Sequence, residues 1–254
     1  MPTTLEVLFA PAEFAALPNR DLRETVCVVF DIFRATSTIV TALANGAAAI
    51  IPVAEIPEAL AIRKERPEVL LAGERGGLRI RADLTGGPDF DLGNSPREFT
   101  PARIHGKTIV LSTTNGSRAL RACAQAKVVV IGSFLNLRAT AEYLQRQAPT
   151  HLLLVCSGTA DQASYEDVLG AGAMAELAWP TYSGGEVADS ARIALQIYEQ
   201  NRHDVLNAVN YCRNGRRLLS MPDLRDDVPW CLQRDCFQMV AGLEGGAVIK
   251  LDAI

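Results

Sequence analysis

Several features that mark other protein classes are missing from this 254-residue sequence. No stretch approaches the roughly 18–20 consecutive apolar residues of a membrane span, and the start, MPTTLEVLFAPAEF, lacks the basic segment of a secretory signal. The six cysteines form no CxxC pair, which argues against a zinc or disulfide framework. We therefore expect a cytoplasmic protein with no membrane partner, in which most cysteines are small buried hydrophobes.

Basic charge is also scarce. The chain has 25 Lys and Arg against 29 Asp and Glu, a net charge of −4, and a pI of about 5.5, so we expect no nucleic-acid partner. Neither GxGxxG nor GxxxxGK[ST] occurs, and the three histidines share no motif, which leaves nucleotide, zinc and Ser-His-Asp chemistry unsupported. The cations are 21 Arg and 4 Lys, and guanidinium groups suit phosphate, sulfonate and carboxylate.

Short β-branched runs alternate with apolar helical stretches along most of the chain. Strands are predicted at residues 5–9, 26–30, 49–53, 69–71, 108–111, 128–131, 152–156 and 247–251, and helices at 35–44, 56–66, 117–124, 137–147, 166–178, 187–198, 205–212 and 229–237. This alternation predicts an α/β fold with a largely parallel sheet, built from repeated strand-turn-helix units. We expect one domain over residues 1–254, with two α/β lobes at about 1–105 and 106–254 as the alternative.

Breaks in the pattern fall at three places. Residues 73–101 are punctuated by glycine and proline and predict a long loop, which in compact domains is usually functional or disordered. Residues 180–185 predict a turn after the 166–178 helix, and Asn214-Gly215 predicts the end of the 205–212 helix.

Three predicted strand-to-helix turns carry polar side chains: DIFRATST at 31–38, STTNGSR at 112–118 and SGT at 157–159. Ligands of open α/β sheets bind beyond the carboxyl ends of the strands, and the amides that begin a helix attract anions. Arg34 and Arg118 add permanent charge to two of the turns. Helix capping is the alternative role for the hydroxyls. The candidate phosphate ligands are Thr36, Ser37, Thr114, Asn115, Gly116, Ser117, Ser157, Gly158 and Thr159.

Asp31 directly follows an apolar strand. This position suits a metal-bound carboxylate, a nucleophile that accepts a phosphoryl group, or a simple helix cap. Haloacid-dehalogenase phosphatases require a second acid two residues later, where this chain has Phe33, so that family is excluded. Glu74, Glu166 and Asp167 are further hard oxygen donors that Mg²⁺ could use, whereas most other acids are expected to be surface charge.

Seven motifs carry a family resemblance. They are, in order, VVFDIFRATSTIVTALANGA, LLAGERGG, FDLGNSP, LSTTNGSRAL, GSFLN, CSGT and YEDVLGAG. Together they resemble the 2-phosphosulfolactate phosphatase family from about Val26 to about Asp235. The resemblance implies a three-layer α/β/α fold and Mg²⁺-dependent hydrolysis of (2R)-2-phospho-3-sulfolactate to 3-sulfolactate and phosphate, a step toward coenzyme M.

The resemblance also implies a set of site residues. It places Asp31, Arg34, Glu74, Arg118, Glu166 and Asp167 in or near the site. We expect Asp31, Arg34 and Arg118 to be catalytic and Asp31 to hold Mg²⁺ with Glu166 or Asp167, with Glu74 as a further candidate ligand. Arg75, Asn94, Thr114 and Asn115 would lie in or near the substrate site. The expected partner is a small anionic organophosphate, and the small residues at 170–178 permit a homo-oligomer. The alternatives are a phosphatase for another 2-hydroxy acid phosphate ester, or a non-catalytic module that binds an anionic metabolite.

Overall fold

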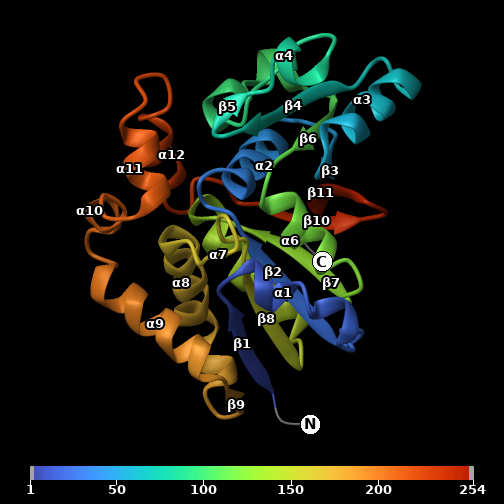
Figure 1. Ribbon diagram of the computed structural model, residues 1–254. Coiled ribbons are helices and arrows are strands. Elements are labelled where there is room, and N and C mark those ends of the chain that lie inside the picture. The colour runs from blue at the N-terminus through green and yellow to red at the C-terminus, as the bar shows by residue number, and fades with distance from the viewer. Residues whose placement is uncertain (1–2, 252–254) are drawn as a thin grey trace.

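The computed structural model describes residues 3–251 and contains one large sheet covered by helices (Figure 1). Its strands are β1 (Thr4–Leu8), β2 (Thr25–Phe30), β3 (Ala49–Val53), β4 (Leu70–Arg75), β5 (Leu78–Arg79), β6 (Thr108–Ser112), β7 (Val128–Gly132), β8 (His151–Cys156), β9 (Glu186–Val187), β10 (Val240–Glu244) and β11 (Ala247–Leu251). The spatial order is β5-β4-β6-β3-β11-β10-β7-β2-β8-β1-β9.

Helices fill most of the connections. They are α1 (Pro11–Phe14), α2 (Ala35–Ala44), α3 (Ile56–Glu65), α4 (Ala82–Thr85), α5 (Pro101–Ile104), α6 (Gly116–Ala122), α7 (Leu137–Gln147), α8 (Tyr165–Tyr182), α9 (Asp189–Asn201), α10 (Val205–Val209), α11 (Arg213–Leu219) and α12 (Asp227–Cys231). Three 3₁₀ turns are η1 (Leu17–Asn19), η2 (Pro96–Glu98) and η3 (Phe134–Asn136). No helix within residues 3–251 is long and apolar enough to cross a membrane.

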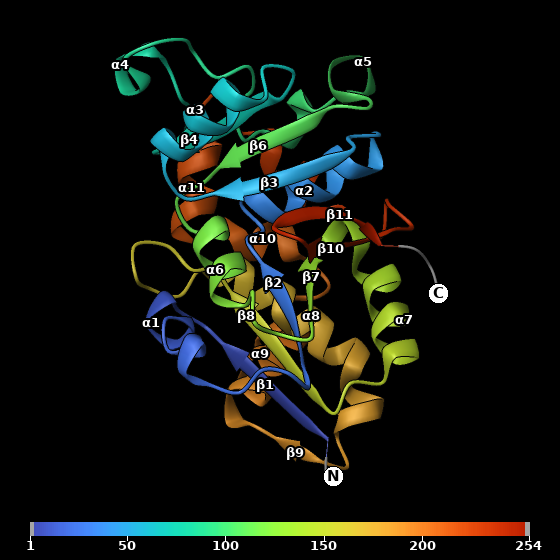
Figure 2. The same ribbon diagram turned by 90° about the vertical axis from the view of Figure 1, so that its right-hand side faces the viewer.

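The sheet has two parallel parts. β4, β6 and β3 form one, and β7, β2, β8, β1 and β9 form the other. The antiparallel hairpin β10–β11 lies between them and pairs with each part through one register pair, Gly242 with Val130 and Val248 with Ile50. In Figure 2 the arrows of β3 and β6 run across those of β2 and β7, so the carboxyl ends of both parts approach one region.

The core lies on both faces of the central strand β2, in which every residue is buried. Val28 and Phe30 pack in a cluster with residues of α7, α8 and α9, whereas Cys27 and Val29 pack with residues of α1, α2 and α6. A parallel strand covered by helices on both faces has this continuous apolar sequence. The predicted α/β/α fold with a largely parallel sheet is confirmed, and the single-domain organisation of residues 1–254 stays a prediction.

Two predicted helix breaks are wrong. Pro180 lies inside α8, which runs to Tyr182 because its packing against α9 outweighs the lost backbone hydrogen bond. Asn214 and Gly215 lie in the first turn of α11, where the Cys212 sulfur accepts a hydrogen bond from the Gly215 amide (3.1 Å). A side chain at Gly215 would meet the Val209 carbonyl at 2.1 Å, so this glycine permits a close approach.

Other differences lie in the later and irregular segments. The helix predicted at 229–237 ends at Cys231, and the strand β10 that follows it was not predicted. The predicted 73–101 loop contains the end of β4 together with β5, α4 and η2. By contrast, the bounds of α2, α7, β3 and β11 match the prediction residue for residue.

Candidate active site

The three polar turns meet at one pocket of about 250 Å³. The turn after β2 contributes Asp31 and Arg34, the turn after β6 contributes Thr114, Asn115 and Arg118, and the turn after β8 contributes Thr159. Further walls come from the β4–β5 turn, from Asn94 and from α11, and include Glu74, Gly76, Gly77, Asn214 and Arg217. The crossed sheet therefore brings together side chains that are far apart in the sequence.

Asp31 is a buried carboxylate, 8% exposed, on the wall of this pocket. Its Oδ1 accepts a hydrogen bond from the Ala35 amide (3.2 Å) at the start of α2. Burial raises the pKa of Asp31 to about 6, and the nearby charges of Glu74 and Glu166 act in the same direction. A side chain at position 116 would meet Asp31 Oδ2 at 2.8 Å, so Gly116 lets the α6 backbone approach the carboxylate.

Asp167 ties two of the turns together from behind the pocket. Its Oδ1 accepts a hydrogen bond from the Ile32 amide (2.8 Å), and its Oδ2 accepts one from the Gly158 amide (3.1 Å) and one from the Ser157 hydroxyl (3.3 Å). Burial and the charges of neighbouring carboxylates raise the pKa of Asp167 well above its ordinary value. This side chain does not line the pocket. Its hydrogen bonds hold the turn after β2 and the turn after β8 together.

Glu166 is also removed from the pocket. It is buried in the first turn of α8, and its Oε1 accepts a hydrogen bond from Asn214 Nδ2 (2.6 Å). The same Nδ2 donates to Thr159 Oγ1 (2.9 Å). Glu166 therefore holds Asn214, and through it Thr159, on the pocket wall.

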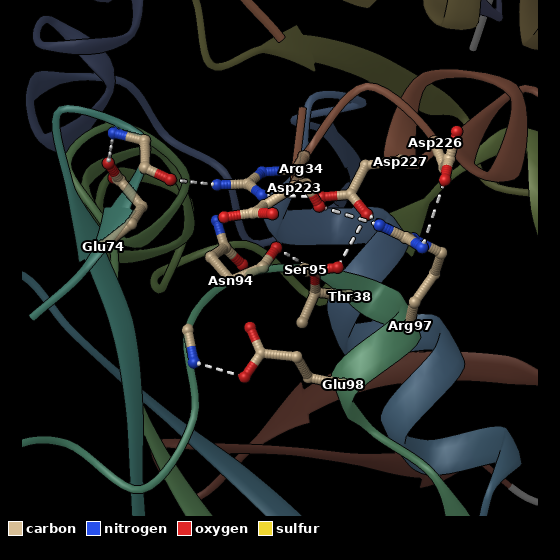
Figure 3. A network of polar contacts seen from close by, with 12 residues as sticks. Arg34, Thr38, Glu74, Asn94, Ser95, Arg97, Glu98, Asp223, Asp226 and Asp227 are labelled. Atoms are coloured by element: carbon tan, nitrogen blue, oxygen red, sulfur yellow. Dashed lines mark hydrogen bonds and ion pairs between the residues drawn. The ribbon is translucent and has the colours of Figure 1, made fainter. Parts of the chain in front are cut away.

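Arg34 is held by a buried ion pair (Figure 3). Its Nη1 lies 2.6 Å from Asp227 Oδ2, and its Nη2 donates to the Gly77 carbonyl (2.6 Å). The other carboxylate oxygen, Asp227 Oδ1, accepts hydrogen bonds from Ser95 Oγ (2.6 Å) and Arg97 Nε (2.9 Å). The side chains of Arg34 and Asp227 are 3% and 0% exposed, so the guanidinium has one fixed position.

Glu74 and Arg75 point to different places. Glu74 lines the pocket, accepts a hydrogen bond from the Gly77 amide (2.7 Å) and accepts another from Thr114 Oγ1 (3.0 Å). Arg75 lines a neighbouring cavity of about 630 Å³ and donates to the Ala54 carbonyl (2.7 Å) and Ser112 Oγ (3.0 Å). Its contacts therefore brace the ends of β3 and β6.

Asn94 lies on the wall between the two cavities. Its backbone carbonyl accepts a hydrogen bond from Thr38 Oγ1 (2.9 Å). Its side-chain Oδ1 is buried and has no hydrogen-bond partner within the described chain. A buried acceptor without a donor costs free energy, so this oxygen is a candidate ligand atom.

Several predicted phosphate ligands instead stabilise the turns. Thr36 Oγ1 accepts a hydrogen bond from the Asp31 amide (3.0 Å), and Ser37 Oγ donates to the Ile32 carbonyl (3.0 Å). Ser117 Oγ pairs with Thr113 Oγ1 (3.1 Å). These residues, like Ser157 and Gly158, are not among those that line the pocket. Neither α2 nor α6 has a hydrogen bond from its N-cap side chain, so these hydroxyls bond to groups of their own turns and do not cap the helices.

Asn214, Arg217 and Asp227 were not predicted as site residues from the sequence. Asn214 was interpreted as part of a helix stop, and Asp227 was grouped with acids expected at the surface. The available signal for Asp227 is that the apolar residues Val228, Trp230 and Cys231 follow it in the sequence. Nothing in the sequence distinguishes Arg217 from the other arginines of the segment.

The fold and the pocket define an α/β protein that has arginines and carboxylates around a pocket at the strand ends. This arrangement is typical of a phosphate-ester hydrolase. A family model described as 2-phosphosulpholactate phosphatase matches residues 13–246. The chain belongs to this family, whose description is that of a phosphoric monoester hydrolase.

Curated relatives agree with the family match. A protein of Caldanaerobacter subterraneus subsp. tengcongensis is 37% identical over 92% of this chain and 94% of its own length. One of Thermotoga petrophila is 40% identical over 87% and 90%, and one of Carboxydothermus hydrogenoformans is 35% identical over 93% and 91%. Each is named a probable 2-phosphosulfolactate phosphatase.

Proposed function

We propose that this protein is a Mg²⁺-dependent phosphatase that hydrolyses (2R)-2-phospho-3-sulfolactate to 3-sulfolactate and phosphate. The observation that carries the proposal is the pocket itself, which is lined by the buried Asp31 together with three arginines, Arg34, Arg118 and Arg217. The family match and the names of the relatives support the choice of substrate.

The charges of the pocket suit a multiply charged ester. The substrate carries a phosphate, a sulfonate and a carboxylate, so a protein of net charge −4 must concentrate positive potential at the site. Three arginines supply it. Asp31 and Glu74 on the same walls would repel the phosphate unless a cation lay between them.

The residues present fit Mg²⁺. Asp31 and Glu74 are hard oxygen donors that line one pocket and lie close enough for the Glu74 charge to raise the pKa of Asp31. The unpartnered Asn94 Oδ1 is a third donor. Mg²⁺ keeps several water ligands and is usually bound through one or two carboxylates, so Asp31 and Glu74 are enough carboxylates for it. When bound, Mg²⁺ would neutralise phosphate charge and act as a Lewis acid.

The chain's own residues have separate parts in the proposed reaction. Asp31, with a pKa of about 6, is mostly ionised at neutral pH, so it can attack the phosphorus or orient an attacking water. Arg34 is fixed before the substrate arrives and stabilises charge on the transferring phosphoryl group without reorganisation. Arg118 on α6 adds a second cation at the more exposed side.

The two routes of attack differ in their stereochemistry. Direct attack by water inverts the configuration at phosphorus, whereas two successive displacements through a phospho-Asp31 intermediate retain it. Hydrolysis of a substrate with an isotopically chiral phosphoryl group therefore distinguishes the routes. Rapid acid quenching should trap a phosphoenzyme in the second route only.

The experiment that tests the function is a substrate panel with detection of released phosphate, run with and without EDTA. We expect the highest kcat/KM for 2-phosphosulfolactate and loss of activity in EDTA that added Mg²⁺ restores. A preference for phospholactate or phosphoglycerate would instead identify a phosphatase of another 2-hydroxy acid. Tight phosphate binding without turnover would identify a binding module and contradict the proposal.

We propose further that the reaction takes place in the cytoplasm and supplies sulfolactate on a route to coenzyme M. The names of the relatives support the sulfolactate product.

A further inference from the structure

Arg217 reaches across the entrance of the pocket. It lies on α11, and its Nη2 donates a hydrogen bond to the Gly76 carbonyl in the β4–β5 turn. A side chain at Gly76 would lie 3.3 Å from this Nη2. The guanidinium therefore joins two segments that are 141 residues apart, and both segments line the pocket.

The charge of Arg217 is not compensated in the way that the charges of the other two pocket arginines are. Arg34 is paired with the buried Asp227 at 2.6 Å, and Arg118 lies 3.6 Å from Asp161. For Arg217, no carboxylate oxygen of the described chain, residues 3–251, lies within 4.0 Å. A guanidinium has five N–H donors, and the bond to Gly76 uses one of them. Its remaining donors and its whole charge are available to a ligand.

Depth separates Arg217 from the proposed chemistry. Asp31 and Arg34 are both buried, whereas Arg217 is exposed. A pocket of about 250 Å³ accommodates one small molecule. If its phosphate contacts Asp31 and Arg34, the far end of the same molecule extends toward the entrance, where Arg217 lies.

We infer that Arg217 is a specificity-determining residue, which binds the second acidic group of the substrate, a sulfonate or carboxylate remote from the phosphorus. This inference rests on the proposed function and deepens it. A planar fork of donors matches the oxygens of either group. The residue selects doubly acidic phosphate esters over simple ones and takes no part in breaking the P–O bond.

The kinetic test compares Arg217→Gln with Arg216→Gln. Arg216 is the next residue on α11, is exposed, and donates to the Tyr211 carbonyl (2.9 Å) outside the pocket, so it is a matched control. The substrates are 2-phosphosulfolactate, 2-phospholactate and isopropyl phosphate, which carry two, one and no further acidic groups. Comparison of the first two assigns the sulfonate, and comparison of the last two assigns the carboxylate.

For Arg217→Gln we expect kcat/KM for 2-phosphosulfolactate to fall about 10- to 100-fold, the usual effect of losing one charged hydrogen-bonding group. Isopropyl phosphate should lose about 3-fold or less, and Arg216→Gln should leave the ratio of the two substrates unaltered. Arg217→Lys, which keeps the charge, should restore part of the selectivity. An equal fall for all three substrates, or no change for any, would overturn the inference.

A binding measurement separates this inference from the proposed function. We expect 3-sulfolactate to raise the Tm of the wild-type protein and of Arg216→Gln but to have little effect on Arg217→Gln, while inorganic phosphate raises the Tm of all three. This result would support Arg217 as the anion ligand even if the wild-type enzyme failed to hydrolyse the sulfonated ester. Equal shifts with 3-sulfolactate in all three proteins would contradict it.

Discussion

The floor and the entrance of the pocket are built differently. On the floor, Asp31 and Arg34 are buried and held by partners that are themselves buried. At the entrance, Arg118 is 47% exposed and faces an exposed partner, Asp161, at 3.6 Å. Groups held before the substrate arrives lower a reaction barrier most effectively, whereas exposed groups mainly add binding energy that water and salt weaken. We therefore assign chemistry to the floor and recognition to the entrance.

The sharpest test of the floor is Asp31→Asn. This variant keeps the shape of the side chain and removes its negative charge, so kcat should fall by at least ~100-fold, the scale of losing one electrostatic element of an active site. The measurement is steady-state phosphate release at saturating Mg²⁺. Turnover near that of the wild type, in a variant with a native circular dichroism spectrum, would remove Asp31 from the mechanism.

The largest effect on stability should come from Asp227→Asn, which leaves Arg34 and Arg97 without their buried carboxylate. Breaking a buried ion pair by removing one partner typically destabilises a protein by about 3–5 kcal/mol, and urea unfolding measures this loss. The matched control is Glu176→Gln. Glu176 lies at the same 2.6 Å from Arg202, but these side chains are 27% and 46% exposed, so we expect a loss of about 1 kcal/mol or less. Equal losses would show that burial does not distinguish the two pairs.

The raised pKa of Asp31 predicts that this buried carboxylate lowers the stability of the folded protein at neutral pH but not at acidic pH. Because its pKa is about 6 in the folded protein and close to 3.8 in the unfolded chain, its contribution to stability is present below pH 4 and is lost as the pH rises through 6. In EDTA, Asp31→Asn should therefore match the wild type near pH 4 and exceed it by on the order of 1–3 kcal/mol above pH 6. A difference in Tm that is constant between pH 4 and 8 would contradict the raised pKa.

The smallest effect should be that of Arg118→Ala at the entrance. We expect KM to rise by about 10-fold, the loss expected for one charged hydrogen bond, with Tm within about 2 °C of the wild type because the side chain is exposed. Increasing salt should reduce the difference between the two proteins. A variant that melts much earlier at unchanged KM would assign Arg118 to packing.

The same difference between floor and entrance explains what the sequence could reveal. Asp31, Arg34 and Asn115 lie in the turns that follow apolar strands, and a local pattern of strand, polar turn and helix was enough to place them at strand ends. The ion pair of Arg34 with Asp227 joins residues 193 positions apart, and no local pattern contains both. Arg217 likewise reaches the site through the tertiary placement of α11.

A helix or strand was predicted correctly where its local sequence contains the signals that determine its structure. Helix α2 has the apolar residues Ile39, Val40 and Leu43 and a clear Asn45-Gly46 end, and its bounds were predicted correctly. Pro180 and Gly215 are reliable breakers in isolation, yet contacts with α9 and with Val209 determine the structure around them. Strand β10 was not predicted because Gly242 interrupts its apolar sequence and because its structure depends on pairing with β11.

The late position of the β10–β11 hairpin in the chain bears on when the protein can become active during translation. During translation β1–β9 and the helices are synthesised before these two strands. In the sheet formed by residues 3–251, the hairpin alone joins one parallel part to the other. The pocket is lined by residues from both parallel parts of the sheet and the turns that follow them. The nascent enzyme should therefore remain inactive until translation has passed Leu251, whatever structure its earlier segments have already gained.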